Sequence, residues 1–276
     1  MNKSVIIMGA NGGLGASISK SFVANGWSVF LLARNKKKLE LLKNQLDQLR
    51  TNTQIIEIYQ VDVKQQTQVD KALDFFIERY GPPLRLVNNV GENGPLGKLE
   101  NVTWGDWVEG FSTNIFSFVY FMQRVIPLMK AQNYGRIVTL SGGGATAPLP
   151  YISSYAASKA ALIRLVETLA LEVKDYDIQI NAVAPGVMKS SITEEYLSHD
   201  SILPKEFTKK IREAFNQSDE IIKKATDLIF YLCTQQKNFI SGKLISSLWD
   251  PWPFEEGFIT HINQSDTYTL RRLTNI

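Results

Sequence analysis

The sequence of 276 residues contains only one cysteine, Cys233. A lone cysteine cannot form a disulfide within the chain, and it excludes a zinc site built from several thiolates. Histidine is nearly as scarce, because His199 and His261 are the only two and lie far apart in the sequence. Neither has a companion at the spacing of metal ligands, so we expect no metal site and no catalytic triad built on histidine.

Long apolar runs and an excess of charge of one sign are also missing. No run approaches the ~18 apolar residues that a membrane span needs. The first residues, MNKSVIIMGANGG, break into glycines after a short apolar run and lack the cleavage site of a secretory signal. Lys and Arg (30) exceed Asp and Glu (27) by only three, too few for a nucleic-acid-binding surface. We therefore expect a soluble, cytoplasmic protein that binds neither membrane nor nucleic acid.

What the sequence does contain is an alternation of short apolar runs with stretches that repeat apolar residues at helical spacing. The runs are almost continuously apolar, which is typical of parallel strands buried on both faces. This predicts an α/β fold, a doubly wound parallel β-sheet of the Rossmann type with helices on both faces. The expected strands are 5–8, 27–33, 55–61, 84–87, 136–140, 178–183 and 243–248, and the expected helices run from the first glycines to 25–26 and over 37–49, 69–80, 104–132, 153–174 and 220–232.

The chain shows no linker before residue 186, no low-complexity tract and no repeat beyond this alternation. We therefore expect one domain over residues 1–250. Residues 187–216 are polar and weakly periodic, and we expect them to cover the substrate with one or two short helices. Residues 251–276 form a tail that begins with aromatic side chains, which favour burial against the body or a partner subunit.

The first predicted strand runs into a glycine-rich loop and then directly into a helix. Gly9, Gly13 and Gly15 would let the backbone turn and approach a ligand, while the free N–H groups at the start of the helix would hold an anion. Asn11 and Leu14 belong to the same loop. This arrangement predicts a binding site for the pyrophosphate of a dinucleotide.

The end of the second strand decides between NAD and NADP. An acidic residue there would accept hydrogen bonds from both ribose hydroxyls and select NAD. The sequence has Ala33 followed by Arg34 instead. Because a guanidinium suits a 2′-phosphate, we predict that NADP(H) is preferred over NAD(H).

Tyr155 and Lys159 lie four residues apart in a predicted helix and therefore project from one face. A phenol with a pKa of about 10 is a poor acid or base at neutral pH until a nearby cation stabilises the phenolate. Lys159 can supply that cation. The pair therefore predicts acid–base chemistry at Tyr155.

Taken together, these features make the chain resemble the short-chain dehydrogenase/reductase superfamily, in its single-domain variety, over roughly residues 3–248. The resemblance implies hydride transfer between a nicotinamide and a carbonyl carbon, with Tyr155 giving or taking the proton on oxygen. It rests on the glycine loop, on Tyr155 with Lys159, and on Asp62-Val63, residues 88–91, Asn114 and residues 181–186.

The resemblance also implies a role for each matching residue. Lys159 would bind the nicotinamide ribose, and Asn114 would hold a water that links Lys159 to solvent. Asp62 would contact the adenine amino group, with Val63 beside it. The other implied cofactor contacts are Asn89 and Gly91 on the ribose side, Pro185 and Gly186 after the sixth strand, and Ser190 at the nicotinamide carboxamide, where the family usually has threonine.

The sequence departs from the family at the catalytic serine. The usual interval before Tyr155 ends on Gly142, and Ser141 lies one residue further away. We predict that Ser141 acts, because the glycines that follow it make a shift of one residue sterically easy. The alternatives are that the serine role is empty or is filled by another residue.

The residues expected around the substrate are Glu92, Asn93 and the stretches 148–153 and 187–216, which are polar and aromatic mixtures. They favour a polar small molecule of a sugar-like kind as the carbonyl or alcohol substrate. The resemblance further implies a homotetramer or homodimer formed through the helices expected at 104–132 and 153–174.

Two other functions compete with a carbonyl reductase or alcohol dehydrogenase. A catalytically weak protein that binds or senses NADP(H) would explain Gly142 where the family has serine. A nucleotide-sugar epimerase would keep the tyrosine and lysine, but it normally has a larger C-terminal substrate domain than this chain provides.

Overall fold

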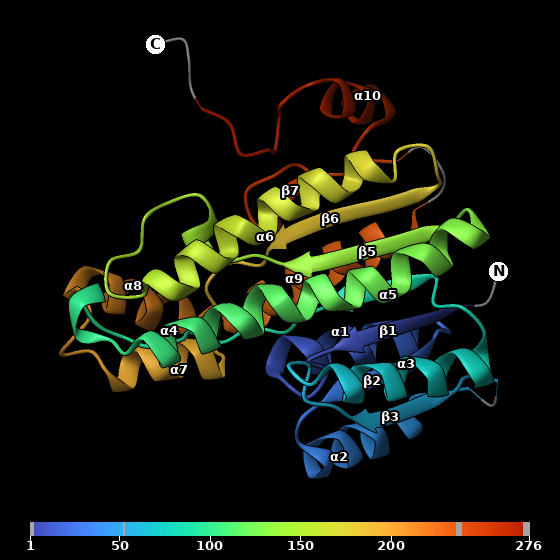
Figure 1. Cartoon of the computed structure of the whole chain (residues 1–276), viewed down its shortest axis with the longest axis horizontal. Coiled ribbons are helices and arrows are strands. Elements are labelled where there is room, and N and C mark those ends of the chain that lie inside the picture. The colour runs from blue at the N-terminus through green and yellow to red at the C-terminus, as the bar shows by residue number, and fades with distance from the viewer. Residues whose placement is uncertain (1–2, 52, 236–238, 273–276) are drawn as a thin grey trace.

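The computed structural model describes residues 3–51, 53–235 and 239–272. Seven parallel strands form one sheet in the order β3-β2-β1-β4-β5-β6-β7 (Figure 1). This confirms the predicted doubly wound parallel sheet. The strands are β1 (Ser4–Met8), β2 (Ser28–Ala33), β3 (Ile56–Gln60), β4 (Arg85–Asn88), β5 (Gly135–Leu140), β6 (Ile178–Ala184) and β7 (Leu244–Ser246).

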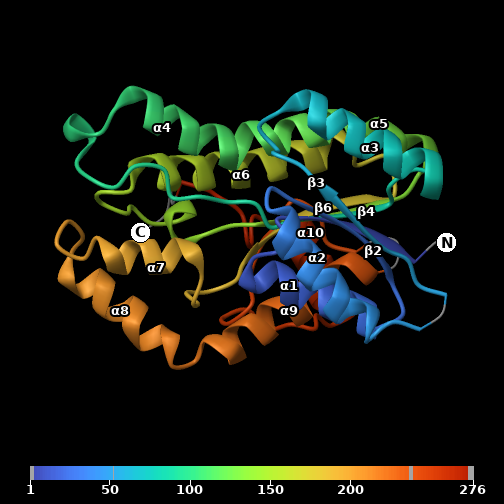
Figure 2. The same cartoon turned by 90° about the horizontal axis from the view of Figure 1, so that it is seen from below.

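Helices cover both faces of this sheet, as Figure 2 shows. Successive residues of a strand point to opposite faces, so Ile6 and Ile7 of β1 enter two different apolar clusters and both are fully buried. Burial on both faces explains why the strands read as continuous apolar runs. One face is covered by α1 (Gly13–Ala24), α2 (Lys36–Asp47) and α9 (Ser218–Thr234), and the other by α3 (Gln66–Tyr80), α5 (Ser117–Gln132) and α6 (Ser153–Glu172).

The stretch predicted as one helix over 104–132 is continuous but not uniform. It consists of α4 (Trp104–Phe111), a π-helical turn over Ser112–Phe116, and α5. Periodicity alone does not reveal a π-turn, which widens the helix by one residue and occurs frequently at functional sites. Asn114 lies within this turn.

Residues 187–216 contain two short helices, where the sequence predicts one or two. They are α7 (Ser191–Ser198) and α8 (Lys205–Phe215), and they lie to one side of the main layers in Figure 2. Ser190 is the N-cap of α7, where its hydroxyl accepts a hydrogen bond from the backbone N–H of Thr193. The backbone N–H of Ser190 donates in return to the hydroxyl of Thr193, which completes a capping box.

The tail holds more structure than its sequence indicates. No element is predicted after residue 248, but Glu256–Gln264 form α10, whose Ile262 is fully buried. Among the aromatic residues, Phe254 of the tail is buried as expected, whereas Trp249, just before the tail, is 85% exposed. Residues 273–276 of the predicted tail lie outside the described residues.

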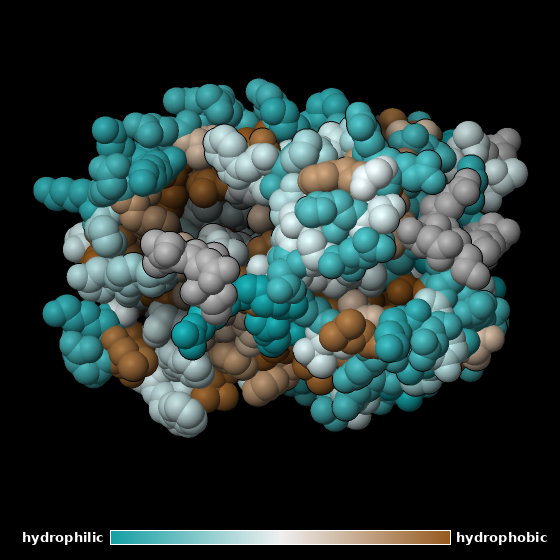
Figure 3. Space-filling model, turned by 90° about the horizontal axis from the view of Figure 1, so that it is seen from above, coloured by the Kyte–Doolittle hydropathy of each residue, from teal (hydrophilic) through white to brown (hydrophobic). Residues whose placement is uncertain are grey.

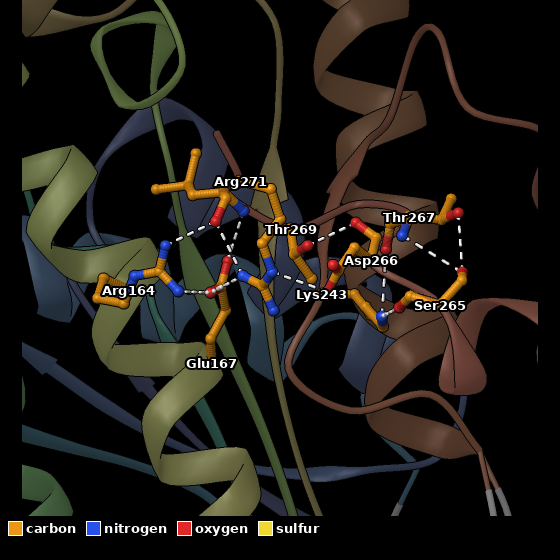
Figure 4. A network of polar contacts seen from close by, with 9 residues as sticks. Arg164, Glu167, Lys243, Ser265, Asp266, Thr267, Thr269 and Arg271 are labelled. Carbon is orange, nitrogen blue, oxygen red and sulfur yellow. Dashed lines mark hydrogen bonds and ion pairs between the residues drawn. The ribbon is translucent and has the colours of Figure 1, made fainter. Parts of the chain in front are cut away.

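Polar contacts fasten the end of the tail to the sheet (Figure 4). The backbone N–H of Leu244 in β7 donates to the carbonyl oxygen of Tyr268 at 2.8 Å. The buried ammonium of Lys243 donates to the carbonyl oxygens of Ser265 and Thr267 at 2.8 and 3.1 Å. The tail therefore covers the outer edge of β7, which would otherwise expose unpaired backbone groups.

A buried carboxylate completes this attachment. Glu167 of α6 accepts hydrogen bonds from the backbone N–H of Leu270 at 2.6 Å and from the guanidinium of Arg271 at 2.9 Å, and it also pairs with Arg164 (Figure 4). The tail is therefore joined to α6 as well as to β7. Among the described residues, the helices are all too short or too polar to cross a membrane.

Candidate active site

A cavity of about 1030 Å³ lies where the strand order of the sheet reverses. β1 pairs with β2 on one side and β4 on the other, so the connections that follow β1 and β4 diverge. Ligands of open α/β sheets bind in such a crevice, beyond the carboxyl ends of the strands. All predicted site residues except Gly15 and Asn114 line it: Gly9, Asn11, Gly13, Leu14, Arg34, Asp62, Val63, Asn89, Gly91, Ser141, Tyr155, Lys159, Pro185, Gly186 and Ser190.

Close backbone contacts shape the loop after β1. Gly9 has a φ of +69°, a conformation that side chains disfavour. A Cβ atom on Gly15 would lie 2.2 Å from the carbonyl oxygen of Gly9 and 2.8 Å from the amide nitrogen of Asn89. That amide donates to the same carbonyl oxygen at 2.9 Å. Gly15 therefore lets α1 pack against the loop, and it does so without lining the cavity.

The start of α1 faces the cavity with its backbone donors available. Gly12 is the N-cap, and in the part of the chain that the structure describes no side chain caps this end and no acidic residue lies in its first turn. The first N–H groups of a helix have no partner within the helix, and they carry its positive end. This end therefore fits the pyrophosphate of a dinucleotide.

The far end of the cavity, after β2 and β3, is lined by cations. Arg34 is exposed, and within the described ranges its guanidinium forms no ion pair. Lys38 lines the same end, and its backbone N–H donates to Asn35, the N-cap of α2. Sequence reasoning assigned only Arg34 to the cofactor. Arg34 begins a basic run, Arg34-Asn35-Lys36-Lys37-Lys38, and the position of Lys38 in this run is the signal that could have added it.

The other end of the cavity contains Tyr155 and Lys159, both buried on α6. The Nζ of Lys159 donates to the carbonyl oxygen of Leu140, at the end of β5, at 2.9 Å and lies 5.8 Å from the centre of the Tyr155 ring. Burial lowers the pKa of Lys159 to about 8 and raises the pKa of Tyr155 to about 12. Desolvation therefore outweighs the expected lowering of the Tyr155 pKa by Lys159.

These values fix the protonation states at neutral pH. The phenol of Tyr155 keeps its proton, because its pKa lies far above 7. The amine of Lys159 is mostly charged at pH 7, and it loses its proton near its pKa of about 8. The buried pair therefore combines a proton donor with a cation that is sensitive to mild alkali.

Asn114 is held in the π-turn by its amide. Its Oδ1 accepts from the backbone N–H of Glu92, and its Nδ2 donates to the carbonyl oxygen of Glu92 and to the hydroxyl of Ser158, all at 2.9 Å. A Cβ on Gly91 would lie 3.4 Å from the Nζ of Lys159 and 3.5 Å from the Oδ1 of Asn114. Glycine at this position therefore leaves space next to both polar groups.

The structure places Gly142, rather than Ser141, opposite the phenol. A Cβ on Gly142 would lie 2.0 Å from the hydroxyl oxygen of Tyr155. Gly142 is extended, with φ −159° and ψ 168°, and neighbouring residues of an extended chain point in opposite directions. Ser141 lines the cavity, and within the described chain its buried hydroxyl has no hydrogen-bond partner. Reaching the oxygen of Tyr155 would require a local shift of the loop.

The loop after β6 carries the last predicted cofactor residues. Gly186 has a φ of +88°, and the hydroxyl of Ser247 donates to the carbonyl oxygen of Pro185 at 3.0 Å. Ser190 lines the cavity while its hydroxyl caps α7. The hydroxyl predicted to contact the nicotinamide carboxamide therefore already accepts a hydrogen bond from the backbone N–H of Thr193.

Two residues expected around the substrate are occupied elsewhere. Glu92 accepts a hydrogen bond from the hydroxyl of Thr113 at 2.7 Å, and neither Glu92 nor Asn93 lines the cavity. Asn93 is buried and donates to the carbonyl oxygen of Ile192 at 3.1 Å and to the carboxylate of Glu195 at 2.7 Å. The expectation for these two side chains is wrong. Asn93 binds α7, and Glu92 binds Thr113 in the π-helical turn.

The helices of 187–216 present apolar side chains to the cavity near Tyr155. The composition of this segment had led us to expect polar surroundings. Ile192 and Tyr196 of α7, and Phe207 and Ile211 of α8, line the cavity together with Leu149. Each pair is four residues apart and therefore faces one side of its helix, a signal that the polar average of the segment conceals. Figure 3 shows a hollow with hydrophobic residues inside it. No group of three or more His, Cys, Asp or Glu side chains suited to a metal occurs within the described part of the chain.

The chain is similar to known proteins in both sequence and fold. The sequence matches the short chain dehydrogenase family over residues 3–201. It is 28% identical over 253 residues to the 7alpha-hydroxysteroid dehydrogenase of Escherichia coli (strain K12), covering 88% of this chain and 92% of that protein.

Solved structures share the fold. An NAD⁺-bound xylitol dehydrogenase has a TM-score of 0.78 at 22% identity and covers 88% of this chain and 96% of its own. ElxO with NADP bound has a TM-score of 0.74 at 26% identity and covers 89% of this chain and 97% of its own. Similar structures therefore hold either dinucleotide.

The close approach at Gly15 generates a prediction about stability. Gly15→Ala should destabilise the protein by about 1–3 kcal/mol, because the new methyl group overlaps the carbonyl oxygen of Gly9. The melting temperature should fall by roughly 2–4 °C for each kcal/mol. Gly13→Ala is the matched control, since its Cβ would meet nothing closer than 3.8 Å. Equal melting temperatures for the two variants in thermal unfolding would show that the space between residue 15 and the carbonyl oxygen of Gly9 can accept a methyl group.

Proposed function

The chain belongs to the short-chain dehydrogenase family, and we propose that it interconverts a ketone and an alcohol with NADP(H), using Tyr155 as the acid or base. One observation carries the proposal: a single cavity joins the glycine loop and Arg34 at one end to the buried Tyr155 and Lys159 at the other. The membership makes the protein an oxidoreductase. The direction of the cofactor preference and the substrate are our own inferences.

The proposed chemistry of reduction divides between the cofactor and the protein. When bound, the dinucleotide supplies the hydride that the carbonyl carbon accepts. The hydroxyl of Tyr155 gives its proton to the carbonyl oxygen, so that the product is an alcohol and Tyr155 becomes a phenolate. Lys159 then stabilises the phenolate by its positive charge. Oxidation of the alcohol reverses these movements, and Ser141 is proposed as a further hydroxyl beside the reacting oxygen.

The protein would hold the dinucleotide by backbone and charge. The N–H groups at the start of α1, with Gly9, Asn11, Gly13 and Leu14 around them, fit the pyrophosphate. Asp62 and Val63 lie where the adenine is expected, and Arg34 with Lys38 would pair with the 2′-phosphate of NADP(H). The other proposed contacts, toward the ribose and nicotinamide, are Asn89, Gly91, Asn114 through a water, Lys159, Pro185, Gly186 and Ser190.

The apolar wall changes the proposed substrate. The sequence favours a polar molecule, but Leu149, Ile192, Phe207 and Ile211 line the cavity beside Tyr155. We propose a ketone or alcohol with an apolar cyclic or aromatic ring. These side chains would hold the ring, and the oxygen of the substrate would point toward Tyr155. The name of the Escherichia coli relative, a 7alpha-hydroxysteroid dehydrogenase, is consistent with such a substrate.

Assembly and location are proposals as well. Large apolar side chains are exposed on the long helical stretches that the resemblance assigns to subunit contacts: Trp104 at 78%, Phe116 at 56% and Leu171 at 71%. Such exposure favours a homodimer or homotetramer. We propose a cytoplasmic location, in which the buried free thiol of Cys233 would stay reduced.

The first test is turnover of a panel of ketones, namely 1-tetralone, acetophenone, cyclohexanone and ethyl acetoacetate, with NADPH. We expect the cyclic and aryl ketones to be reduced fastest. Tyr155→Phe should lower kcat/KM by at least about 100-fold, since the proton donor is lost, while the Kd for NADPH changes little. Tyr176→Phe, a change at a partly exposed tyrosine outside the cavity, is the control.

Binding of NADPH without turnover on the panel would instead favour the catalytically weak sensor protein that Gly142 suggests. A Tyr155→Phe variant as active as the parent would contradict the proposed acid–base role.

The cofactor preference is tested by Arg34→Ala. Losing the charged donor should weaken NADPH binding at least about tenfold and leave NADH binding nearly unchanged. Lys37→Ala is the matched control, because Lys37 belongs to the same basic run but does not line the cavity. Calorimetric titration of each variant with both nucleotides measures the effect. Equal weakening of NADPH and NADH binding by Arg34→Ala would refute the preference.

A further inference from the structure

Tyr196 is a buried phenol that the acid–base scheme above does not use. It projects from α7, is only 4% exposed and lines the cavity. Within the described chain its hydroxyl is buried without a hydrogen-bond partner. A buried hydroxyl without a partner is unfavourable, so at a cavity this hydroxyl is available to donate a hydrogen bond to a bound molecule.

Tyr196 and Tyr155 face the same part of the cavity. They belong to one apolar cluster, which Ile152, Leu203 and Ile211 complete. Burial raises the pKa of Tyr196, and the negative charge that Tyr155 would carry raises it further. The hydroxyl of Tyr196 therefore keeps its proton at neutral pH and is available as a donor.

Contacts on three sides hold Tyr196 in place. The capping box of Ser190 and Thr193 fixes the start of α7. Asn93 binds the next turn through the carbonyl oxygen of Ile192 and the carboxylate of Glu195. The ring of Tyr196 packs edge to face against Phe207, with the ring centres 5.4 Å apart. The phenol is thus positioned by the body of the protein as well as by its own helix.

A donor is also missing on the opposite side of the site. Gly142 faces the hydroxyl of Tyr155 and has no side chain to offer. Ser141 reaches that oxygen only after a shift of the loop, as its neighbour's extended geometry indicates. A developing alkoxide gains from several donors aimed at it, so the site as built has room for another.

We propose that Tyr196 is a catalytic residue that donates a hydrogen bond from its hydroxyl to the oxygen of the substrate, from the α7 side of the cavity. This inference rests on the proposed function. Tyr155 transfers its proton to that oxygen, whereas Tyr196 keeps its own proton and stabilises the negative charge as it develops. The two phenols therefore have different roles, and Ser141 remains an independent donor from the β5 side.

The test compares the parent with Tyr196→Phe, Ser141→Ala and Tyr155→Phe. Tyr196→Phe keeps the ring against Phe207 and removes only the hydroxyl, so thermal unfolding should show no loss of stability. With the ketone of the panel that the parent reduces fastest, we expect kcat to fall at least about tenfold, more than KM rises, because the hydrogen bond strengthens as charge develops. Ser141→Ala, tested alone, should also lower kcat/KM at least about tenfold.

A second measurement does not depend on turnover. In the presence of NADP⁺, which cannot reduce a ketone, 1-tetralone should bind to Tyr196→Phe about fivefold more weakly than to the parent, the loss expected for one neutral hydrogen bond. Calorimetry measures this Kd. The Kd for NADP⁺ itself should stay the same in both proteins.

The outcomes separate the two proposals. If Tyr196→Phe turns over and binds 1-tetralone like the parent while Tyr155→Phe is inactive, the role of Tyr196 is refuted and the proposed function stands. If the parent reduces no ketone, the proposed function fails, and the binding measurement still decides: weaker binding to Tyr196→Phe supports the contact, and equal binding or no binding to the parent overturns it.

Discussion

The hydrogen bond from the ammonium of Lys159 to the carbonyl oxygen of Leu140 joins α6 to the end of β5, and the site depends on it. A buried charge needs such a partner, because burial without one would favour the neutral amine still more strongly. The contact fixes the turn of α6 from which Tyr155 projects into the cavity. Gly91 lies beside this contact, where a Cβ atom would lie 3.4 Å from the Nζ of Lys159 and 3.5 Å from the Oδ1 of Asn114.

The cavity has two halves that the protein builds in different ways. The half proposed for the dinucleotide is formed largely by backbone, namely the loop after β1, the free end of α1 and the close contact between Gly15 and Gly9, with the side chains of Arg34 and Lys38 at its far end. The half proposed for the substrate is lined by side chains of α7 and α8, and Asn93 fastens α7 to the body. We therefore expect changes at the apolar side chains of α7 and α8 to alter the substrate more than the cofactor, whereas Ser190, just before α7, is a proposed cofactor contact.

The sequence was sufficient for the features that depend on local pattern. The seven strands, the glycine loop and the pair Tyr155 and Lys159 follow from apolar runs, from glycines between strand and helix, and from a spacing of four residues. It was insufficient where distant segments meet. The π-turn at Asn114 depends on contacts with Glu92 and Ser158, and α10 depends on burial of Ile262 against the body. The average polarity of 187–216 concealed the apolar sides of α7 and α8, and with them Tyr196.

In the proposed reaction a charged Lys159 supports proton transfer from a protonated Tyr155, and the pH dependence of ketone reduction tests this role most directly. Burial lowers the pKa of Lys159 to about 8, so the charged form is present below that pH and is lost above it. We expect kcat/KM for reduction to be constant from about pH 6 to about pH 7 and to fall above about pH 8. Lys159→Arg should move the fall to higher pH, because a guanidinium stays charged. A parent profile that remains constant up to about pH 10, or an unchanged fall in Lys159→Arg, would contradict it.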